Sequence, residues 1–199
     1  MSNVIGLILS GGAGSRLGGV NKGLVEIAGK PLAAHVYDRL APQVDEVYVS
    51  ANHDQAAYRQ ICINIIHDQP EFYRDGPLAG LQSLIPHVAD DDLIQVVTCD
   101  VPLLPRDLVI VQQNYLRAHQ LDAVWPFDGE RDHYGLLMVK GRCLPQLTQL
   151  LRNQQRRIRD FLTQMNSDAV PFADPTAFIN GNDSPALERI ATILKDKTC

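Results

Sequence analysis

Apolar runs and amphipathic stretches alternate along almost the whole chain. The run Val4–Leu9 is nearly all apolar and is followed by glycines, which predicts a buried strand. In Pro31–Ala41, Leu32, Val36 and Leu40 instead recur every four residues, the spacing of one face of a helix. That range also begins with proline, which suits the first position of a helix. The chain therefore starts with a strand, a glycine-rich loop and a helix.

The same criteria predict further elements up to the last ten residues. Strands are predicted at Val4–Leu9, Glu46–Ser50, Ile63–Ile66, Leu93–Thr98, Ala123–Pro126, Gly135–Lys140, Ala169–Phe172 and Ala177–Ile179. Helices are predicted at Pro31–Ala41, Gln55–Gln60, Pro77–His87, Arg106–Ala118, Arg142–Arg152, Arg157–Met165 and Ser184–Lys195. This alternation predicts right-handed βαβ units in a three-layer αβα, Rossmann-like α/β fold with a mostly parallel sheet. We find no repeat or linker and expect residues 1–199 to form a single domain.

Composition narrows the class of protein. Of the 199 residues, 45% are hydrophobic and 21% are charged, an ordinary globular balance. The formal charge of −5 provides no global basic field for nucleic acid. No apolar run approaches the ~20 residues of a membrane span, and the first residues lack the basic start of a signal peptide. The four cysteines show no metal or disulfide spacing, so we expect a cytoplasmic protein with free thiols.

The loop after the first strand is the strongest chemical feature. Glycine allows backbone N–H groups to approach an anion closely, and successive N–H groups can form an anion nest. Arginine and lysine side chains beside such a nest add full positive charges that bind phosphates. The loop carries Gly11, Gly12, Gly14, Arg16, Gly18, Gly19 and Lys22. This composition predicts a site for the phosphates of a nucleotide.

Two familiar phosphate loops do not fit the spacing. A P-loop needs a glycine-lysine pair followed by a hydroxyl residue, whereas Lys22 lies between Asn21 and Gly23. The dinucleotide fingerprint G-x-G-x-x-G needs a third small residue for close packing of helix and strand, and this chain has Leu17 there. We therefore look for another class of nucleotide-binding protein.

Carboxylates and polar side chains follow the predicted strands. Asp100 comes directly after an apolar strand, where it could hold Mg²⁺ together with substrate phosphates, or merely cap the next segment. The turn that includes Gly76 and Pro77 enters a helix, whose first N–H groups are free for a ligand. Other strand-end residues are as typical of turns as of binding sites: Ser50, Asn52 and Asp68.

The second half of the chain has weaker candidates. Asn180 and Asn182 lie in a predicted strand-to-helix loop, where asparagine is also a common turn residue. Arg156 and Arg157 precede a short helix and could bind a phosphate-bearing substrate or form a basic surface pair. The charged segment 128–133 is interpreted as a solvated hairpin loop.

The pattern G-G-x-G-x-R-L-G-G-x-x-K-G-L, with G-P-L-A-G, C-D-V-P and N-G-N after it, resembles the molybdenum cofactor guanylyltransferases, the MobA family. The resemblance implies a nucleotide-diphospho-sugar transferase-like fold, whose N-terminal half binds nucleotide and whose C-terminal half binds the cofactor substrate. It also implies transfer of GMP from GTP to the terminal phosphate of molybdenum-molybdopterin, with Mg²⁺ as the metal. The products are the guanine dinucleotide cofactor and pyrophosphate. Proteins that handle molybdopterin or mature molybdoenzymes are further candidate partners.

The resemblance also assigns roles to residues. Arg16, Lys22 and Asp100 are implied to be catalytic, and Asp100 to be the metal ligand. The implied GTP-binding residues are Leu9, Ser10, Gly11, Gly12, Gly14, Lys22, Ser50, Asn52, Asp68, Gly76, Pro77, Leu78, Gly80 and Asp100. The implied molybdopterin-binding residues are Arg156, Asn180 and Asn182.

Two alternatives stay open. One is a cytidylyl- or sugar-phosphate nucleotidyltransferase of the same fold, which nucleotide competition would distinguish. The other is a nucleotide-binding protein without catalytic activity. Asp100 argues against the second, because a binding protein needs no metal carboxylate.

Overall fold

A seven-stranded sheet organises the computed structural model, which describes residues 2–10 and 21–196. The strand order is β5-β4-β1-β6-β8-β7-β9. The strands are β1 (Val4–Leu9), β4 (Glu46–Ser50), β5 (Ile65–Ile66), β6 (Leu93–Thr98), β7 (Ala123–Phe127), β8 (Met138–Lys140) and β9 (Ser167–Pro171). A separate small hairpin joins β2 (Glu26–Ile27) to β3 (Lys30–Pro31).

The sheet is parallel except at β8. Strand β1 pairs in parallel with β4 and β6, so that Leu7 lies opposite Tyr48 and Val96. Strand β8 pairs antiparallel with both β6 and β7, and β7 then pairs in parallel with β9. All described strands of this sheet except β8 therefore end at the same edge, where an open α/β sheet binds its ligands. This result confirms the predicted mostly parallel αβα architecture.

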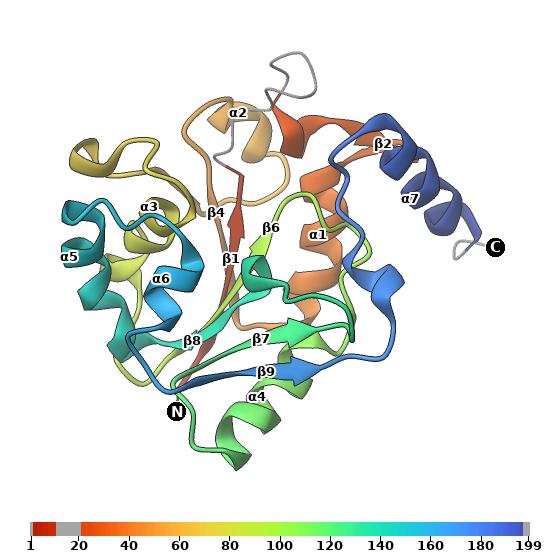
Figure 1. Cartoon of the computed structure of the whole chain (residues 1–199). Helices are drawn as coiled ribbons and strands as arrows, with labels where there is room; N and C mark the ends of the chain where they lie inside the picture. The colour runs from red at the N-terminus through yellow and green to blue at the C-terminus, as the bar shows by residue number, and fades with distance from the viewer. Residues whose placement is uncertain (1, 11–20, 197–199) are drawn as a thin grey trace.

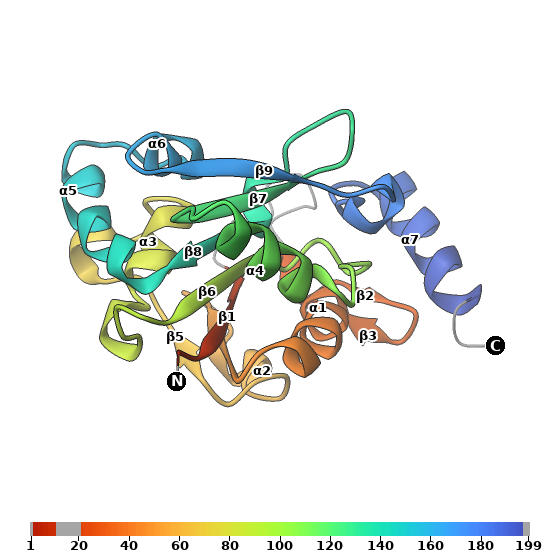
Figure 2. The same ribbon diagram turned by 90° about the horizontal axis from the view of Figure 1, so that it is seen from below.

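Helices cover both faces of the sheet (Figures 1 and 2). One face packs on α1 and α4 and the other on α3, α5 and α6, while α7 lies outside α1 near the small hairpin. The helices are α1 (Leu32–Leu40), α2 (Gln55–Tyr58), α3 (Pro77–Gln82), α4 (Leu108–Ala118), α5 (Leu147–Arg152), α6 (Ile158–Leu162) and α7 (Ser184–Asp196). Shorter 3₁₀ helices are η2 (Lys22–Leu24), η3 (Ala41–Gln43), η4 (Pro70–Phe72), η5 (Ile85–His87), η6 (Tyr134–Leu136), η7 (Gly141–Gln146) and η8 (Pro175–Phe178).

The hydrophobic pattern explains this layering. In α1, the predicted face of Leu32, Val36 and Leu40 is completely buried. In β1, Ile8 belongs to the core on the α1 side and Leu7 to the core on the α3 side. A strand buried on both faces needs this near-continuous apolar run. None of the helices in the described residues is long and apolar enough to cross a membrane.

Several elements differ in type or in bounds from the prediction, and each of these differences occurs near a proline. The predicted strand Ala177–Ile179 is wrong, because Pro175–Phe178 forms a 3₁₀ helix whose first turn is capped by Asp174 accepting the N–H of Thr176 at 2.9 Å. The predicted helix 77–87 ends at Gln82 and is followed by η5, which contains a proline at residue 86. A proline has no N–H to continue the helical hydrogen bonds. Similarly, the predicted helix 142–152 begins as a 3₁₀ helix that contains a proline at residue 145.

Two other differences concern short elements. The predicted strand 135–140 starts only at Met138, since the preceding residues form η6. The hairpin of β2 and β3 was not predicted, and its turn places Ala28 and Gly29 at positive φ.

Candidate active site

The parallel strand ends gather the predicted polar residues at one edge. The backbone N–H of Ser10 donates to Ser50 O at 2.9 Å, and the N–H of Cys99 donates to Leu9 O at 3.1 Å. These bonds continue the sheet past the ends of β1, β4 and β6. Ser10, Ser50 and Asp100 therefore lie on adjoining strand ends, as the topology requires.

Lys22, Asp100 and Asn182 meet in one cluster at this edge. The Lys22 ammonium donates to Asp100 Oδ2 at 2.5 Å and also to Asn182 Oδ1. The side chains of Lys22 and Asp100 are mostly buried, with 18% and 16% of their surfaces exposed. Three residues that sequence motifs indicated separately are thus brought together around one positive charge.

Backbone contacts hold the members of the cluster in place. The N–H of Gly181 donates to Asp100 O at 2.8 Å, which fixes the Asn180–Asn182 segment against the end of β6. This segment follows η8 rather than the strand that we predicted. The structure therefore joins a C-terminal loop directly to the strand end that carries the carboxylate.

Tyr58, which no sequence pattern indicated, contacts the residues on both sides of Lys22. Its fully buried hydroxyl donates to Asn21 Oδ1 at 2.7 Å, next to the start of η2. Burial raises the pKa of the Tyr58 phenol, so the group remains a neutral donor. The side chain of Tyr58 also lies in the space that any side chain at Gly23 would need.

Asp100 has a free coordination position. Its Oδ1 is buried and has no hydrogen-bond partner among the described residues, while Oδ2 binds Lys22. An unpaired buried carboxylate oxygen is costly unless something else binds it. Mg²⁺ prefers oxygen ligands and is bound through one or two carboxylates plus substrate phosphates. The buried Oδ1 of Asp100, unpartnered among the described residues, is an oxygen donor of the kind that Mg²⁺ prefers.

The thiol beside this carboxylate is not a nucleophile. Burial, followed by the negative charge of Asp100, raises the pKa of the Cys99 thiol to about 12. A thiol with that pKa is protonated near neutral pH.

Asn52 and Asp68 bind each other across the ends of β4 and β5. Asn52 Nδ2 donates to Asp68 Oδ2 at 2.6 Å, and the N–H of Asp68 donates to Asn52 Oδ1 at 3.0 Å. The N–H of Arg74 also donates to Asp68 Oδ2 at 3.0 Å. The pair braces the edge of the sheet beside Ser50, and the binding role of these two residues stays a prediction.

The start of α3 packs closely on β1 and β4. Gly76 has a φ of +81°, and Pro77 opens the helix. A Cβ on Gly80 would lie 2.8 Å from both Leu9 Cδ2 and Ser50 Oγ, so glycine lets the helix approach these strands. Leu78 is completely buried in the core, where its side chain packs on the α3 side of the sheet.

Arg156, a predicted molybdopterin-binding residue, lies against the start of α3. Its Nε donates to Asp75 Oδ1 at 2.8 Å, and its carbonyl oxygen lies 3.4 Å from an ideal Cβ on Gly76. The structure thus connects a residue of the predicted cofactor half to the helix of the predicted nucleotide half.

Four predicted residues lie outside the described part of the chain. They are Gly11, Gly12, Gly14 and Arg16.

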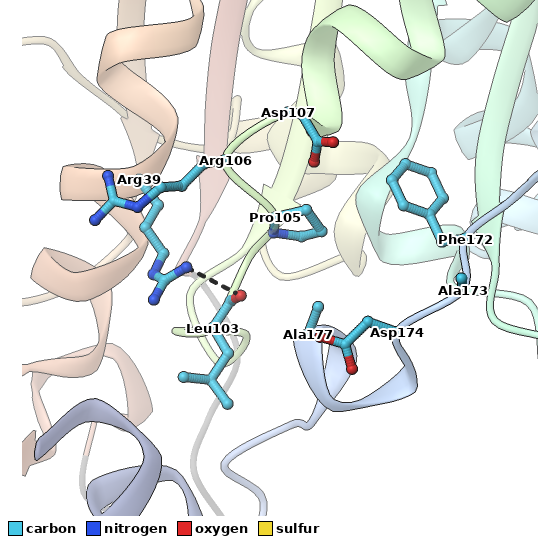
Figure 3. A pocket seen from close by; sticks show the side chains of 9 residues that line it. All are labelled: Arg39, Leu103, Pro105, Arg106, Asp107, Phe172, Ala173, Asp174 and Ala177. Carbon is cyan, nitrogen blue, oxygen red and sulfur yellow. Dashed lines mark hydrogen bonds between the residues drawn. The ribbon is translucent and has the colours of Figure 1, made fainter. Parts of the chain in front are cut away.

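A hollow of about 670 Å³ lies apart from the Lys22 cluster (Figure 3). Its lining includes Arg39, Arg106, Phe172 and Asp174 but none of the three clustered residues. Arg39 Nη1 donates to Leu103 O at 3.3 Å and to the next carbonyl oxygen at 3.0 Å. The hollow therefore lies behind the segment that follows Asp100, and Arg39 braces that segment.

Comparisons with known proteins agree on one family. Residues 6–170 match the model of the MobA-like NTP transferase domain. The chain is 37% identical over 189 residues to a molybdenum cofactor guanylyltransferase of Photobacterium profundum, covering 94% of this chain and 95% of that protein. It is 35% identical over 186 residues to one of Shewanella sp. (strain MR-4), covering 93% of each chain.

Solved structures support the fold. Molybdopterin-guanine dinucleotide biosynthesis protein A from Archaeoglobus fulgidus superposes with a TM-score of 0.79 at 19% identity, covering 96% of this chain and 99% of that one. The 4-diphosphocytidyl-2C-methyl-D-erythritol synthase from Anaerococcus prevotii superposes with a TM-score of 0.75 at 10% identity, covering 98% of this chain and 96% of that one. Proteins named for different nucleotides therefore share this architecture.

Proposed function

Since this chain belongs to the MobA-like NTP transferase family, we propose that it is a molybdenum cofactor guanylyltransferase. The enzyme transfers GMP from GTP to the terminal phosphate of molybdenum-molybdopterin. The observation that carries the proposal is the cluster of Lys22, Asp100 and Asn182 at the carboxyl edge of the sheet. A lysine donor, a carboxylate with an unpaired oxygen and an amide suit a reaction between two phosphates.

The reaction needs little covalent help from the protein. An oxygen of the acceptor's terminal phosphate attacks the α-phosphorus of GTP and forms a new P–O bond. The bond between the α-phosphorus and the oxygen that joins it to the β-phosphorus breaks, and the electron pair of that bond leaves with pyrophosphate. The acceptor phosphate is already anionic, so no general base is required, and catalysis depends on positioning and neutralisation of charge.

Lys22 and Asp100 have separate tasks in this scheme. The Lys22 ammonium, Arg16 and the amides of the glycine loop stabilise the charge that develops on pyrophosphate. Asp100, whose Oδ1 has no hydrogen-bond partner among the described residues, would hold Mg²⁺. When bound, Mg²⁺ neutralises phosphate charge and orients the two substrates.

We assign the nucleotide to the side of the site formed by β1, β4 and α3. Its wall includes Leu9, Ser10, Ser50 and the helix start at Gly76 and Gly80, braced by the paired Asn52 and Asp68. The Ser50 hydroxyl is buried against Gly80 and is not exposed to a ligand. We therefore assign any contact with GTP at this strand end to backbone atoms of the residues next to Ser50. Asn180, Asn182 and Arg156 then belong to the acceptor.

Nucleotide choice distinguishes this proposal from a cytidylyl- or sugar-phosphate nucleotidyltransferase of the same fold. The experiment measures pyrophosphate release with GTP, CTP or ATP, each with Mg²⁺ and molybdopterin. We expect release with GTP and at least about tenfold lower kcat/KM with CTP and ATP, which corresponds to ~1.4 kcal/mol of discrimination. Preference for CTP, or release only with a sugar phosphate as acceptor, would overturn the assignment. Tight GTP binding without release would favour a non-catalytic protein.

A further inference from the structure

Two aromatic rings form a fixed pair near the active site that the proposed mechanism does not use. Trp125 of β7 and Tyr134 of η6 have ring centroids 5.2 Å apart with their planes at 44°. Asp132 joins them, since its Oδ1 accepts the Trp125 Nε1–H at 2.7 Å and its Oδ2 accepts the Tyr134 hydroxyl at 3.0 Å. Both rings are partly exposed. We call these three residues the aromatic platform.

The platform adjoins the strand end that carries Asp100. Helix η6 packs beside β6, and an ideal Cβ on Gly135 would lie 3.0 Å from Thr98 Cγ2. Gly135 directly follows Tyr134, and Thr98 precedes Asp100 by two positions. The platform therefore lies beside β6, the strand that leads to Asp100.

Basic residues of the α6 region border the other side of the platform. The pKa of the Tyr134 phenol is raised by burial and by its hydrogen bond to Asp132, while the nearby positive charge of Arg159 opposes that rise. Arg156, just before α6, reaches Asp75 at the start of α3. Helix α6 packs against η6, and Arg156 links the segment before α6 to the segment before α3.

The strand order places the aromatic platform on the far side of Asp100 from β1 and β4. The residues that we assign to GTP lie on β1, β4 and α3, whereas Trp125 lies on β7, beyond β6 and β8 in the sheet. With Asp100 between the two sides, a molecule on the platform would extend its phosphate toward Asp100 from the side that GTP does not occupy.

We propose that the aromatic platform binds the pterin ring of the acceptor, an inference that rests on the proposed function and adds the residues that select its substrate. A flat heteroaromatic ring stacks favourably on tryptophan and tyrosine. Asp132 holds the two rings and gives the platform a negative charge that favours the N–H donors of a pterin over an acceptor without them. Arg159 and Arg156 lie where anionic groups of the acceptor would be neutralised.

Fluorescence tests the platform without any mutation, because Trp125 is the only tryptophan of the chain. We expect molybdopterin to quench the emission of the wild-type protein by at least about half after correction for absorbance with free tryptophan. GTP with Mg²⁺ should leave the emission nearly unchanged. Quenching by GTP in place of molybdopterin would instead assign the guanine ring to the platform and overturn the proposal.

Steady-state kinetics provides the second test. Loss of a stacked ring weakens binding by roughly tenfold or more, so Trp125→Ala should raise the KM for molybdopterin by about that factor and leave the KM for GTP unchanged. Trp125→Phe keeps an aromatic ring at this position, so it should raise the KM for molybdopterin much less. An unchanged KM for molybdopterin in a folded Trp125→Ala protein would overturn the platform.

The two proposals fail in distinguishable ways. A wild-type protein that binds GTP but releases no pyrophosphate with molybdopterin overturns the proposed function. A wild-type protein that is active, with the same kinetics in Trp125→Ala, overturns only the platform. If Trp125→Ala does not fold, the wild-type titration decides alone.

Discussion

At the scale of single residues, one positive charge connects three distant parts of the chain. Lys22 Nζ contacts the carboxylate of Asp100 and the amide of Asn182, although 160 positions separate Lys22 from Asn182. Because this ammonium is mostly buried, its field is screened less than that of a surface lysine. The charge is therefore available to phosphates that bind beside Asp100.

We expect Lys22→Ala to lower kcat by at least ~10²-fold, the scale of a lost electrostatic donor in a transition state. The measurement is steady-state pyrophosphate release, with a thermal unfolding curve to show that the variant is folded. Lys30→Ala is the matched control, since Lys30 pairs with Asp38 in an exposed ion pair, and it should keep nearly full activity. Activity of the folded Lys22→Ala protein within about twofold of wild type would contradict the role of Lys22.

At the scale of elements, α3 depends on two glycines with different tasks. Gly76 adopts positive φ just before the helix, a conformation that other residues resist. Gly80 lets the helix pack on Leu9 and Ser50 at a separation that a Cβ would prevent. The position of α3 over the ends of β1 and β4 therefore depends on the absence of one side chain.

Gly80→Ala should destabilise the protein by roughly 1–3 kcal/mol, the usual cost of overpacking a core. Urea unfolding measures this free energy. Because Ser50 Oγ is one of the two obstructing atoms, adding Ser50→Ala to Gly80→Ala should restore part of the loss. Equal stability of Gly80→Ala and wild type would show that α3 can move away at no cost.

The observed bounds of the elements show why local sequence patterns predicted the secondary structure only in part. The strand Val4–Leu9 has the predicted bounds because a long apolar run and a glycine loop agree. The segment 177–179 is equally apolar, but Pro175 and the cap from Asp174 start a 3₁₀ turn there. A short apolar run alone does not decide between strand and turn, and here the turn chemistry decides the conformation.

At the scale of the whole molecule, the predicted nucleotide and cofactor halves share one sheet. Strand β8 of the second half pairs with β6 of the first. Buried Gln95 Nε2 of β6 donates to Leu136 O at 3.2 Å, and Gln112 Nε2 donates to the same oxygen at 3.0 Å. Neither half can bury its apolar faces without the other.

We therefore predict a single cooperative unfolding transition. The enthalpy from calorimetry should equal the van't Hoff enthalpy, and the emission of Trp125 in the second half should change together with the far-ultraviolet circular dichroism of the whole chain. Two separated transitions would show that the halves are independent domains.

The sequence by itself determined where most of the main strands lie along the chain, the class of fold and the residue types that follow those strands. These follow from local rules, since apolar runs predict buried strands and parallel strands end at a common edge. Only the tertiary structure decided which of those residues touch. The pairing of Lys22 with Asp100 and Asn182, the support from Tyr58 and the platform of Trp125 and Tyr134 depend on long-range packing, and spacing along a chain does not encode such distances.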